Sequence, residues 1–488
     1  MPVVFIPEQN RSLVVEAGTS LLDALKQGGI YPDAPCGGRG SCGKCRVFAD
    51  GVEVSACQTA VCRDMTVTLP QTAQPRILRD GILTEYRLDP LQEGYLAAFD
   101  IGTTSVVCFL LDGSTGAELA KSSVLNPQTV FGADVVSRVQ AALRGALAQL
   151  TGLIRNAVAS LIEDVCQSAG ISPEEIGVIS LVGNPAMQQL FLGISPENLA
   201  RPPFSPVLTE AGVLPCREIL PLCPRAQLLI VPDISGYVGA DTLGCLLATG
   251  LYEADRLTLL VDIGTNGEMV LGSKNRMIAC ATAAGPALEG AKIRFGMRGA
   301  EGAIDHVWLE NGEVRYSVIG GGKAVGICGS GLLDAVAVGL RLGLINHRGR
   351  ICNEDHIFRL TEVIWLTQED IRQVQLAKGA ISAGIRLMAG QLGVEPSAIA
   401  QVQLAGAFGS FLDPESACRI GLLPEELLDR IQIVGNAAGS GAKLLSLDKQ
   451  LLPFAEELTE RIEFLELAGL KEFPRTFAKS MLFREETL

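Results

Sequence analysis

The tetrapeptide Asp-Ile-Gly-Thr occurs twice in this chain of 488 residues, at positions 100–103 and 262–265. Each copy lies between two short apolar runs, which is typical of a strand, a tight turn and a second strand. An internal repeat at this distance predicts two domains of similar build.

The residues of each turn suit the binding of a phosphate chain. Glycine at the bend lets backbone N–H groups approach phosphate oxygens, and threonine hydroxyls add donors. An aspartate at the strand end can orient a hydrated Mg²⁺, because this ion keeps several waters and takes only one or two carboxylates. One such turn is weak evidence, since a buried strand that ends in an aspartate turn is common. Two copies favour a nucleotide site, with Asp100 and Asp262 as the catalytic, Mg²⁺-organising residues. The expected phosphate-binding residues are Gly102, Thr103, Thr104, Gly264, Thr265 and Asn266.

Three further glycine-rich segments lie in the second half of the chain. Residues 404–410 read Leu-Ala-Gly-Ala-Phe-Gly-Ser, residues 320–331 lead into a helix, and residues 435–442 form a third loop before a helix. A helix N-terminus after such a loop is a good anion site. Each segment alone also fits tight packing between a helix and a strand. The G-x4-G-K-[ST] pattern of P-loop ATPases does not occur.

Together these motifs resemble the phosphate 1, phosphate 2 and adenosine motifs of the superfamily that contains actin, sugar kinases, acetate kinase and the large heat-shock chaperone ATPases. The resemblance implies a duplicated α/β fold in which two RNase-H-like subdomains close on ATP and Mg²⁺. It also implies nucleotide contacts at Gly329, Ser330, Gly406 and Gly409.

The N-terminal part of the chain carries a cysteine loop. Cys36, Cys42 and Cys45 follow the pattern C-x5-C-x2-C in a glycine-rich stretch. Iron–sulfur clusters are held by thiolates, and glycines let the backbone wrap a cluster closely. A fourth thiolate must come from elsewhere, and Cys57 is preferred over its one rival, Cys62. Structural zinc is the alternative, but zinc usually takes paired C-x2-4-C knuckles, and the second knuckle is missing.

This part resembles plant- and vertebrate-type [2Fe–2S] ferredoxins, although fewer residues separate Cys45 from Cys57 than is usual in the plant-type family. Short β-type runs at 3–6 and 13–15, followed by a helical stretch at 21–27, suit an α+β fold of the β-grasp type. The resemblance implies a [2Fe–2S] cluster on Cys36, Cys42, Cys45 and Cys57.

Composition excludes several classes of function. The 40 Lys and Arg against 54 Asp and Glu give a formal net charge of −14, which argues against binding to nucleic acid or to an anionic membrane. No run reaches 18 apolar residues and no signal peptide is evident, so we expect a cytoplasmic protein without a membrane partner. Only three histidines occur, so histidine chemistry is poorly supplied.

Changes in pattern divide the chain into four predicted segments. They are a ferredoxin-like domain at 1–70, a linker at 71–94, one ATPase subdomain at 95–255, and a second at 256–488 whose C-terminal part returns to the core. Helical periodicity is clear at 135–150 and 153–167. Thr19 and Thr367 are predicted helix caps, and Asp370 is predicted to complete an imperfect capping box with Thr367.

The order of the motifs resembles that of a whole family. From the N-terminus they are the cysteine loop, DIGTTS, NPQxxFGAD, GNP, PPFxP, DIGTNGE, GICGSGLLD, LTQEDI, LAGAFGS and GNAAGSGA. This order is similar to that of the ATP-dependent, ferredoxin-fused reductive activators of corrinoid proteins, over almost the whole chain. The segment between the cysteine loop and the ATPase part is shorter in this chain than in the longest members of that family.

The resemblance implies an iron–sulfur enzyme that reduces cobalt(II) to cobalt(I) by one electron and needs ATP to do so. The implied partners are a corrinoid protein of a methyltransferase system, a low-potential electron donor and a second copy of the chain. Two other classes stay open: a small-molecule kinase with an accessory redox domain, and an ATP-sensing redox switch or scaffold without turnover. Dehydratase activators of the same superfamily are disfavoured, because they lack a ferredoxin domain.

Overall fold

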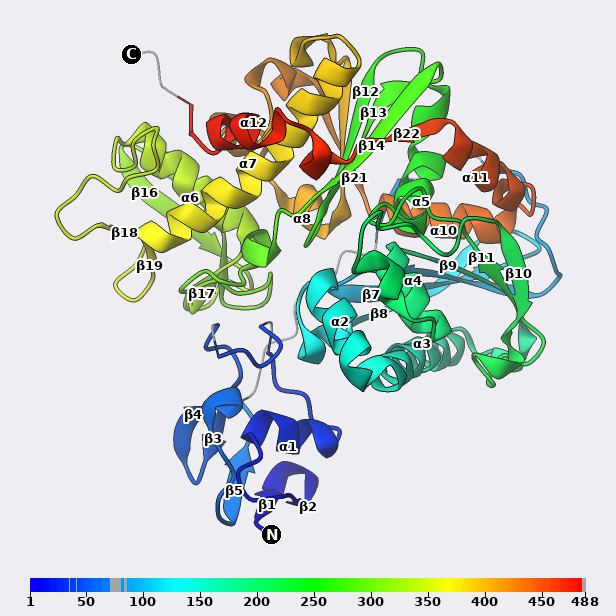
Figure 1. Ribbon diagram of the computed structural model, residues 1–488, viewed down its shortest axis with the longest axis horizontal. Coiled ribbons are helices and arrows are strands. Elements are labelled where there is room, and N and C mark those ends of the chain that lie inside the picture. The colour runs from blue at the N-terminus through cyan, green and yellow to red at the C-terminus, as the bar shows by residue number, and fades with distance from the viewer. Residues whose placement is uncertain (35, 41, 71–79, 83–85, 485–488) are drawn as a thin grey trace.

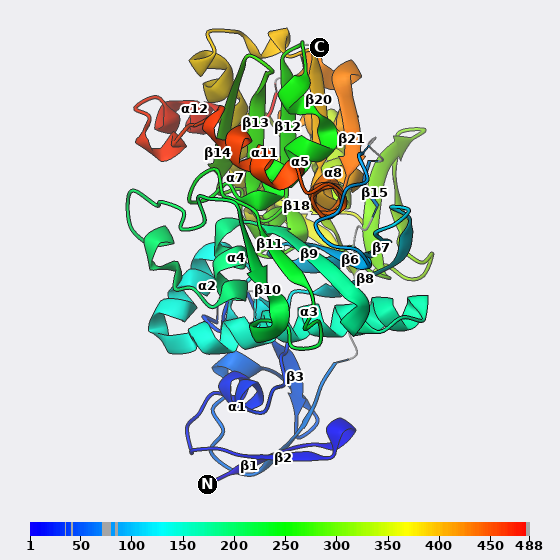
Figure 2. The same ribbon diagram turned by 90° about the vertical axis from the view of Figure 1, so that its right-hand side faces the viewer.

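The computed structural model describes residues 1–34, 36–40, 42–70, 80–82 and 86–484 (Figure 1). A small N-terminal unit, drawn in blue, lies below a larger body, and the described part of that body contains two six-stranded sheets. Figure 2 shows the same arrangement after a turn of 90°. The cysteine loop therefore belongs to one part of the molecule and both Asp-Ile-Gly-Thr turns to the other.

The N-terminal unit is a five-stranded sheet in the order β2-β1-β5-β3-β4, with β1 parallel to β5. Leu21, Leu22 and Leu25 of the single helix form a common core with Val4 and Ile6 of the sheet. The elements are β1 (Val3–Ile6), β2 (Arg11–Val14), α1 (Leu21–Gln27), β3 (Arg46–Ala49), β4 (Val52–Ser55) and β5 (Met65–Thr68). The β-grasp prediction is confirmed.

The predicted cap of α1 is wrong by one residue. Ser20, not Thr19, caps the helix, and its hydroxyl oxygen accepts from the backbone N–H of Asp23 at 3.1 Å. The carbonyl of Thr19 instead accepts from the N–H of Val61. The pairing of this segment with the chain near Val61 therefore fixes where the helix begins.

The first large sheet has the order β10-β11-β9-β6-β7-β8. Three antiparallel strands lie on one side, namely β6 (Tyr95–Ile101), β7 (Ser105–Asp112) and β8 (Glu118–Leu125). The parallel strands β9 (Ile176–Gly183) and β11 (Gln227–Ile230) follow on the other side of β6, and β10 (Gly212–Pro215) closes the edge. Every residue of β9 is buried, as expected for a parallel strand covered on both faces.

The second large sheet repeats this arrangement in the order β21-β20-β12-β13-β14-β22. Its antiparallel strands are β12 (Thr258–Ile263), β13 (Gly267–Ser273) and β14 (Arg276–Thr282). The strands β20 (Gln401–Ala405) and β21 (Ile431–Gly435) are parallel to β12, and β22 (Ile462–Phe464) lies at the edge. The predicted duplicated RNase-H-like fold is thus confirmed.

The two sheets share a core made by helices α5 (Ala240–Thr249) and α10 (Ala437–Leu447). The helix α10 comes from the C-terminal part of the chain but packs on the first sheet, where its Ala442 carbonyl accepts from the Ser180 hydroxyl at 2.6 Å. A Cβ on Gly441 would lie 2.1 Å from the Gly244 carbonyl oxygen, so only glycine permits this close approach of the two helices.

A long kinked helical stretch covers the first sheet. It consists of α2 (Val135–Ala141), a π-helical turn (Ala142–Ala146) and α3 (Leu147–Ala169). The break predicted between the helices at 135–150 and 153–167 is misplaced, because the chain bends at Gly145, where φ is 100°. Among the described residues this stretch is the one that is long and apolar enough to span a membrane, yet its buried residues belong to the core beneath β7 and β8.

The second half of the chain adds elements around its sheet. Thr367 and Asp370 form the predicted capping box at the start of the longest helix, α7, which is therefore confirmed. These elements are β15 (Ala303–Glu310), β16 (Glu313–Val318), β17 (Gly326–Ile327), α6 (Gly329–Arg341), β18 (Ile357–Arg359), β19 (Trp365–Thr367), α7 (Gln368–Gln391), α8 (Gly406–Phe411), α9 (Pro414–Arg419), α11 (Leu451–Glu460) and α12 (Phe473–Ser480). In the first half, α4 (Pro185–Leu192) follows β9.

Candidate active site

The two Asp-Ile-Gly-Thr turns face each other between the two large sheets. The first turn joins β6 to β7, and the second joins β12 to β13. The hydroxyl oxygens of Thr104 and Thr265 lie 3.4 Å apart. The repeated turns therefore form a single site, to which each half of the fold contributes one side.

One pocket contains nearly all of the predicted nucleotide residues. Its lining includes Asp100, Gly102, Thr103, Thr104, Asp262, Gly264, Thr265, Asn266, Gly329, Ser330 and Gly406. Gly406 begins α8 with φ 82°, and a Cβ there would lie 2.3 Å from a carboxylate oxygen of Asp262. Gly409 does not line the pocket and faces Leu404 instead, so its position gives no support for the predicted nucleotide contact.

Four partly exposed carboxyl groups lie close together in this pocket: Asp100, Asp241, Asp262 and Glu268. Burial, followed by the charges of Asp262 and Asp241, raises the pKa of Asp100 to about 7. Burial and then Asp262 raise the pKa of Asp241 to about 7, and burial raises that of Asp262 to about 6. Burial also raises the pKa of Glu268, with Asp241 and Asp262 adding to the shift. A bound cation would offset this mutual repulsion.

The carboxylates fit an ion that keeps its water shell. Among the described residues, no three His, Cys, Asp or Glu side chains converge closely enough to coordinate one ion directly. Mg²⁺ retains several waters and is usually bound through one or two carboxylates together with phosphates. Asn436 also donates to Asp100 at 3.0 Å, which fixes that carboxylate at the pocket wall.

Glu289 bridges the two turns. It ends a short 3-10 helix, Pro286–Glu289, and one carboxylate oxygen accepts from the Thr104 hydroxyl at 2.6 Å. Its other oxygen accepts from the Thr265 hydroxyl at 2.8 Å. A single carboxylate thus binds a hydroxyl from each half of the fold.

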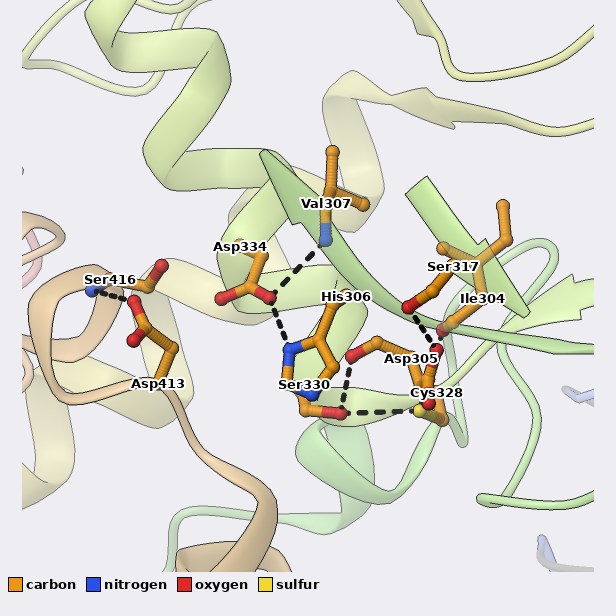
Figure 3. Close-up of polar contacts among 10 residues, drawn as sticks. All are labelled: Ile304, Asp305, His306, Val307, Ser317, Cys328, Ser330, Asp334, Asp413 and Ser416. Atoms are coloured by element: carbon orange, nitrogen blue, oxygen red, sulfur yellow. Dashed lines mark hydrogen bonds and ion pairs between the residues drawn. The ribbon is translucent and has the colours of Figure 1, made fainter. Parts of the chain in front are cut away.

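The pocket lining also includes His306, which forms a pair with Asp334 (Figure 3). The His306 ring nitrogen Nδ1 lies 3.0 Å from Asp334, which is buried and also accepts from the N–H of Val307. The Asp334 carboxylate, as a hydrogen-bond acceptor for the ring, raises the pKa of His306. Ser330, at the N-terminus of α6, donates to the Asp305 carbonyl at 2.8 Å. Phe408 and Phe411 of α8 also line the pocket, and such aromatic side chains suit a nucleoside.

The first turn is held from behind by Arg138 of α2. This side chain is completely buried and donates to the carbonyls of Thr103 and Gly132, the latter at 3.0 Å. It also donates to Gln128 at 3.3 Å. The loop that contains NPQxxFGAD is thereby tied to the backbone of the phosphate-binding turn.

The cysteine loop brings four thiols together in two pairs. The thiol of Cys42 is hydrogen-bonded to that of Cys36, and the Cys57 backbone N–H donates to the Cys45 sulfur at 3.4 Å. Burial raises the pKa of Cys57 to about 11, and the Cys45 thiol adds to the shift. The backbone wraps this group through glycines with positive φ, namely Gly37, Gly38, Gly40 and Gly43. Four thiols gathered in pairs fit the ligand set of a [2Fe–2S] cluster.

Cys62 lies elsewhere and is exposed. The Val61 carbonyl next to it accepts from Gly18, which holds this segment beside the start of α1. The geometry therefore favours Cys57 over Cys62 as the fourth thiolate.

The cysteine loop contacts the larger body directly. Lys44, between Cys42 and Cys45, donates to the Gly296 carbonyl at 2.6 Å. Arg39 donates to the Ser137 hydroxyl at 3.1 Å, and Asp33 lies 3.8 Å from Arg298. Figure 1 shows this loop facing α2 and β17. Arg298 and Met297 also line the nucleotide pocket, so a single segment borders both predicted sites.

Several pocket residues were not found from the sequence. Asp241, Glu289 and His306 lie outside the repeated motif, and nothing in their local sequence marks them. Glu268 stands next to the second turn, so its place in the repeat DIGTNGE was a usable signal. All four line the pocket because distant segments meet there.

Family models match three consecutive parts of the chain. A model for the 2Fe-2S iron-sulfur cluster binding domain matches residues 4–65. A model for the RACo middle region matches residues 95–254, and one for the C-terminal domain of RACo, the ASKHA domain, matches residues 256–488. Together these models cover both predicted sites.

Individual proteins match over most of the chain. The corrinoid activation enzyme RamQ of Eubacterium limosum is 36% identical over 423 residues, which cover 81% of this chain and 71% of that protein. The [Co(II) methylated amine-specific corrinoid protein] reductase of Methanosarcina barkeri is 27% identical over 404 residues, with 75% and 73% covered. The solved structure of a reductive activator for corrinoid, iron-sulfur protein superposes with a TM-score of 0.74 at 28% identity, and 99% of this chain and 98% of that chain are covered.

Proposed function

The chain belongs to the family of reductive activators of corrinoid proteins, and from this premise we propose that it reduces cobalt(II) to cobalt(I) in a corrinoid protein at the expense of ATP. The observation that carries the proposal is the contact between the four-cysteine loop and the segment that lines the nucleotide pocket. Because one segment contacts both the redox group and the ATPase site, nucleotide binding can influence electron transfer. A kinase or a simple electron carrier does not need this contact.

The redox site is made by the N-terminal unit. Cys36, Cys42, Cys45 and Cys57 hold the [2Fe–2S] cluster. When bound, the cluster supplies single electrons at a potential near about −400 mV, as in plant-type ferredoxins. Cys36 and Cys45 are buried away from water, and Lys44 places a positive charge beside Cys42.

The nucleotide site takes Mg-ATP between the two turns. Asp100 and Asp262 orient the hydrated Mg²⁺, with Asp241 and Glu268 adding negative charge around it. The phosphates bind to the backbone and hydroxyls of Gly102, Thr103, Thr104, Gly264, Thr265 and Asn266. Gly406, Gly329 and Ser330 contact the nucleotide as well. Such sites promote phosphoryl transfer by positioning and by charge neutralisation.

ATP is required because the electron transfer is uphill. The cobalt(II)/cobalt(I) couple lies at a very low potential, and one-electron transfer against a potential difference costs roughly 1.4 kcal/mol per 59 mV. Nucleotide-driven closure of the two halves can offset this cost by changing the complex with the corrinoid protein.

The division of the chain at 1–70, 71–94, 95–255 and 256–488 is part of this proposal. The partners are a corrinoid protein of a methyltransferase system and a low-potential electron donor, and the chain acts as a homodimer in the cytoplasm. The net charge of −14 is consistent with the absence of nucleic acid and anionic membrane among these partners.

A spectroscopic assay tests the function. The anaerobically reduced protein is mixed with a cobalt(II) corrinoid protein from the same source, with and without Mg-ATP. We expect the cobalt(I) absorption band only when Mg-ATP is present. If no band appears under any condition although the cluster is intact, the proposal fails. Phosphorylation of an added sugar or acyl substrate would then favour the kinase.

A further inference from the structure

Glu289 occupies the donors that the phosphates need. The Thr104 and Thr265 hydroxyls each have a single proton, and both protons are donated to the Glu289 carboxylate. A carboxylate and a triphosphate are both anionic, so they compete for these hydroxyls. Mg-ATP can bind both turns fully only when Glu289 leaves them.

Glu289 is rigidly connected to the segment that contacts the cysteine loop. Its neighbour Gly290 packs backbone against backbone on Gly296 and Met297. A Cβ on Gly290 would lie 2.5 Å from the Met297 carbonyl oxygen, and one on Gly296 would lie 2.1 Å from the Gly290 carbonyl oxygen. Because no side chain lies between these two backbones, a backbone movement at Glu289 is transmitted directly to Gly296.

Gly296 is also the acceptor for Lys44 of the cysteine loop, at 2.6 Å. Arg298, two residues further on, lies 3.8 Å from Asp33 of the same unit. The contacts of Lys44 and Asp33 with the larger body therefore depend on the position of the segment 289–298. This position is fixed as long as Glu289 is hydrogen-bonded to both turns.

We propose that Glu289 is a positioning residue that exchanges places with the phosphates of Mg-ATP, so that nucleotide binding shifts the segment 289–298 and loosens the cysteine loop from the larger body. The inference rests on the proposed function, in which a loop that faces its own ATPase body has to become accessible to a corrinoid protein. It assigns the coupling of ATP to electron transfer to one carboxylate and one short segment.

Equilibrium binding of a non-hydrolysable ATP analogue with Mg²⁺ tests the exchange. Glu289→Gln removes the competing charge and keeps the size of the side chain, so we expect binding about tenfold tighter than in the wild type, within the usual range of coupling between sites. Glu301→Gln is the matched control, because it makes the same change on an exposed residue outside the pocket, and it should bind as the wild type does. Unchanged binding in Glu289→Gln would overturn the proposal. A loss of ATP turnover with unchanged binding would instead make Glu289 a residue that acts on the attacking water.

Lys44→Met tests the connection from the other end. If Mg-ATP binds better to the protein with a loosened loop, then a substitution that loosens the loop must tighten Mg-ATP binding, because coupling is reciprocal. We therefore expect tighter analogue binding in Lys44→Met, although Lys44 touches no residue of the turns. The cluster absorption spectrum checks that the variant still holds its cluster. Wild-type affinity in a cluster-loaded variant would overturn the proposal.

Hydrogen–deuterium exchange of the full-length protein gives a readout that does not depend on catalysis. The analogue should raise exchange in the segments 36–46 and 290–298 of the wild type, and Glu289→Gln should show raised exchange in 36–46 without nucleotide. Lower or equal exchange in 36–46 would contradict the inference. None of these measurements uses a corrinoid protein, so their failure is distinct from failure of the cobalt(I) assay.

Discussion

At the scale of single residues, the nucleotide pocket is governed by crowded carboxyl groups. Loss of solvation in the pocket, with neighbouring carboxylates adding to it, raises the pKa of Asp100 and of Asp241 to about 7. Loss of solvation alone raises the pKa of Asp262 to about 6. In the absence of a cation these groups are therefore partly protonated at neutral pH. A divalent ion must displace protons before it can bind, which makes its affinity depend on pH.

We predict that Mg²⁺ binds more weakly as the pH falls. Each carboxyl with a raised pKa is ionised above that pKa and neutral below it. With one proton displaced from a group of pKa about 7, the dissociation constant of Mg²⁺, measured with bound ADP, should rise roughly tenfold from pH 7.5 to pH 6. Asp262→Asn removes one charge and lowers the pKa of Asp100, so Mg²⁺ should bind more weakly and its pH dependence should move to lower pH.

Asp355→Asn serves as the control, since Asp355 is exposed and lies outside the pocket. Calorimetric titration at pH 6 and pH 7.5 provides the comparison. Equal Mg²⁺ affinity at both pH values would show that the ion does not meet these carboxylates.

The sequence predicted those site residues that repeat. Asp100 and Asp262 could be found because each ends a strand before the same turn, and Thr104 and Thr265 because they belong to those turns. Glu289 and His306 could not be found, because each becomes part of the pocket only through tertiary contacts with segments far along the chain. The nucleotide contact predicted at Gly409 stays a prediction, since a Cβ at this position would meet Leu404 and the residue is not among those that line the pocket.

At the scale of secondary structure elements, local signals and tertiary contacts each decided some boundaries. The capping box of α7 followed from two side chains close in sequence, and it is present. The beginning of α1 and the bend in the long helical stretch did not follow the periodicity. Pairing near Val61 fixes the first, and a positive φ at Gly145 fixes the second.

The helix α2 supports the first turn through Arg138, and we predict that its loss is costly. In Arg138→Lys one ammonium group replaces a fork that binds three oxygen acceptors and the Met187 sulfur, so buried carbonyls of the turn and its neighbour lose their donors. Each unsatisfied buried acceptor costs about 1–3 kcal/mol. The free energy of unfolding of the part that contains this turn should therefore fall by about 2–4 kcal/mol. Mg-ATP should also bind more weakly, because Thr103 moves.

Chemical denaturation, followed by circular dichroism, measures the loss of stability. Arg144→Lys is the matched control on the same helical stretch, because Arg144 is exposed, and its change should stay below about 0.5 kcal/mol. An unaltered denaturation midpoint in Arg138→Lys would mean that the turn does not depend on this side chain.

At the scale of the whole molecule, the duplication was predictable and the contacts between its parts were not. The repeat of one motif at domain spacing predicted two similar sheets, which have the same strand order. The way in which the cysteine loop meets the segment 289–298 depends on the shape and hydrogen bonds of both surfaces. No local pattern encodes these contacts, so only the structure reveals that the two sites adjoin.

The N-terminal unit has its own hydrophobic core, separate from the cores of the two large sheets. We therefore predict that the two activities can be separated by single substitutions. Cys57→Ser should lose most of the cluster absorption and all ATP-dependent formation of cobalt(I), but it should still bind Mg-ATP, because the pocket lies in the larger body. Asp262→Asn should show the reverse, with a normal cluster spectrum and weakened Mg-ATP binding.

Cys62→Ser is the matched control for this separation, because Cys62 is exposed and stands apart from the four paired thiols. It should keep both the cluster spectrum and cobalt(I) formation. If Cys62→Ser instead loses the cluster while Cys57→Ser keeps it, Cys62 is the fourth ligand and the loop must rearrange to bind iron. If both variants keep the cluster but Cys57→Ser no longer binds Mg-ATP, then the two parts do not fold independently. In that case the docking of the cysteine loop against Gly296 contributes to the nucleotide pocket itself.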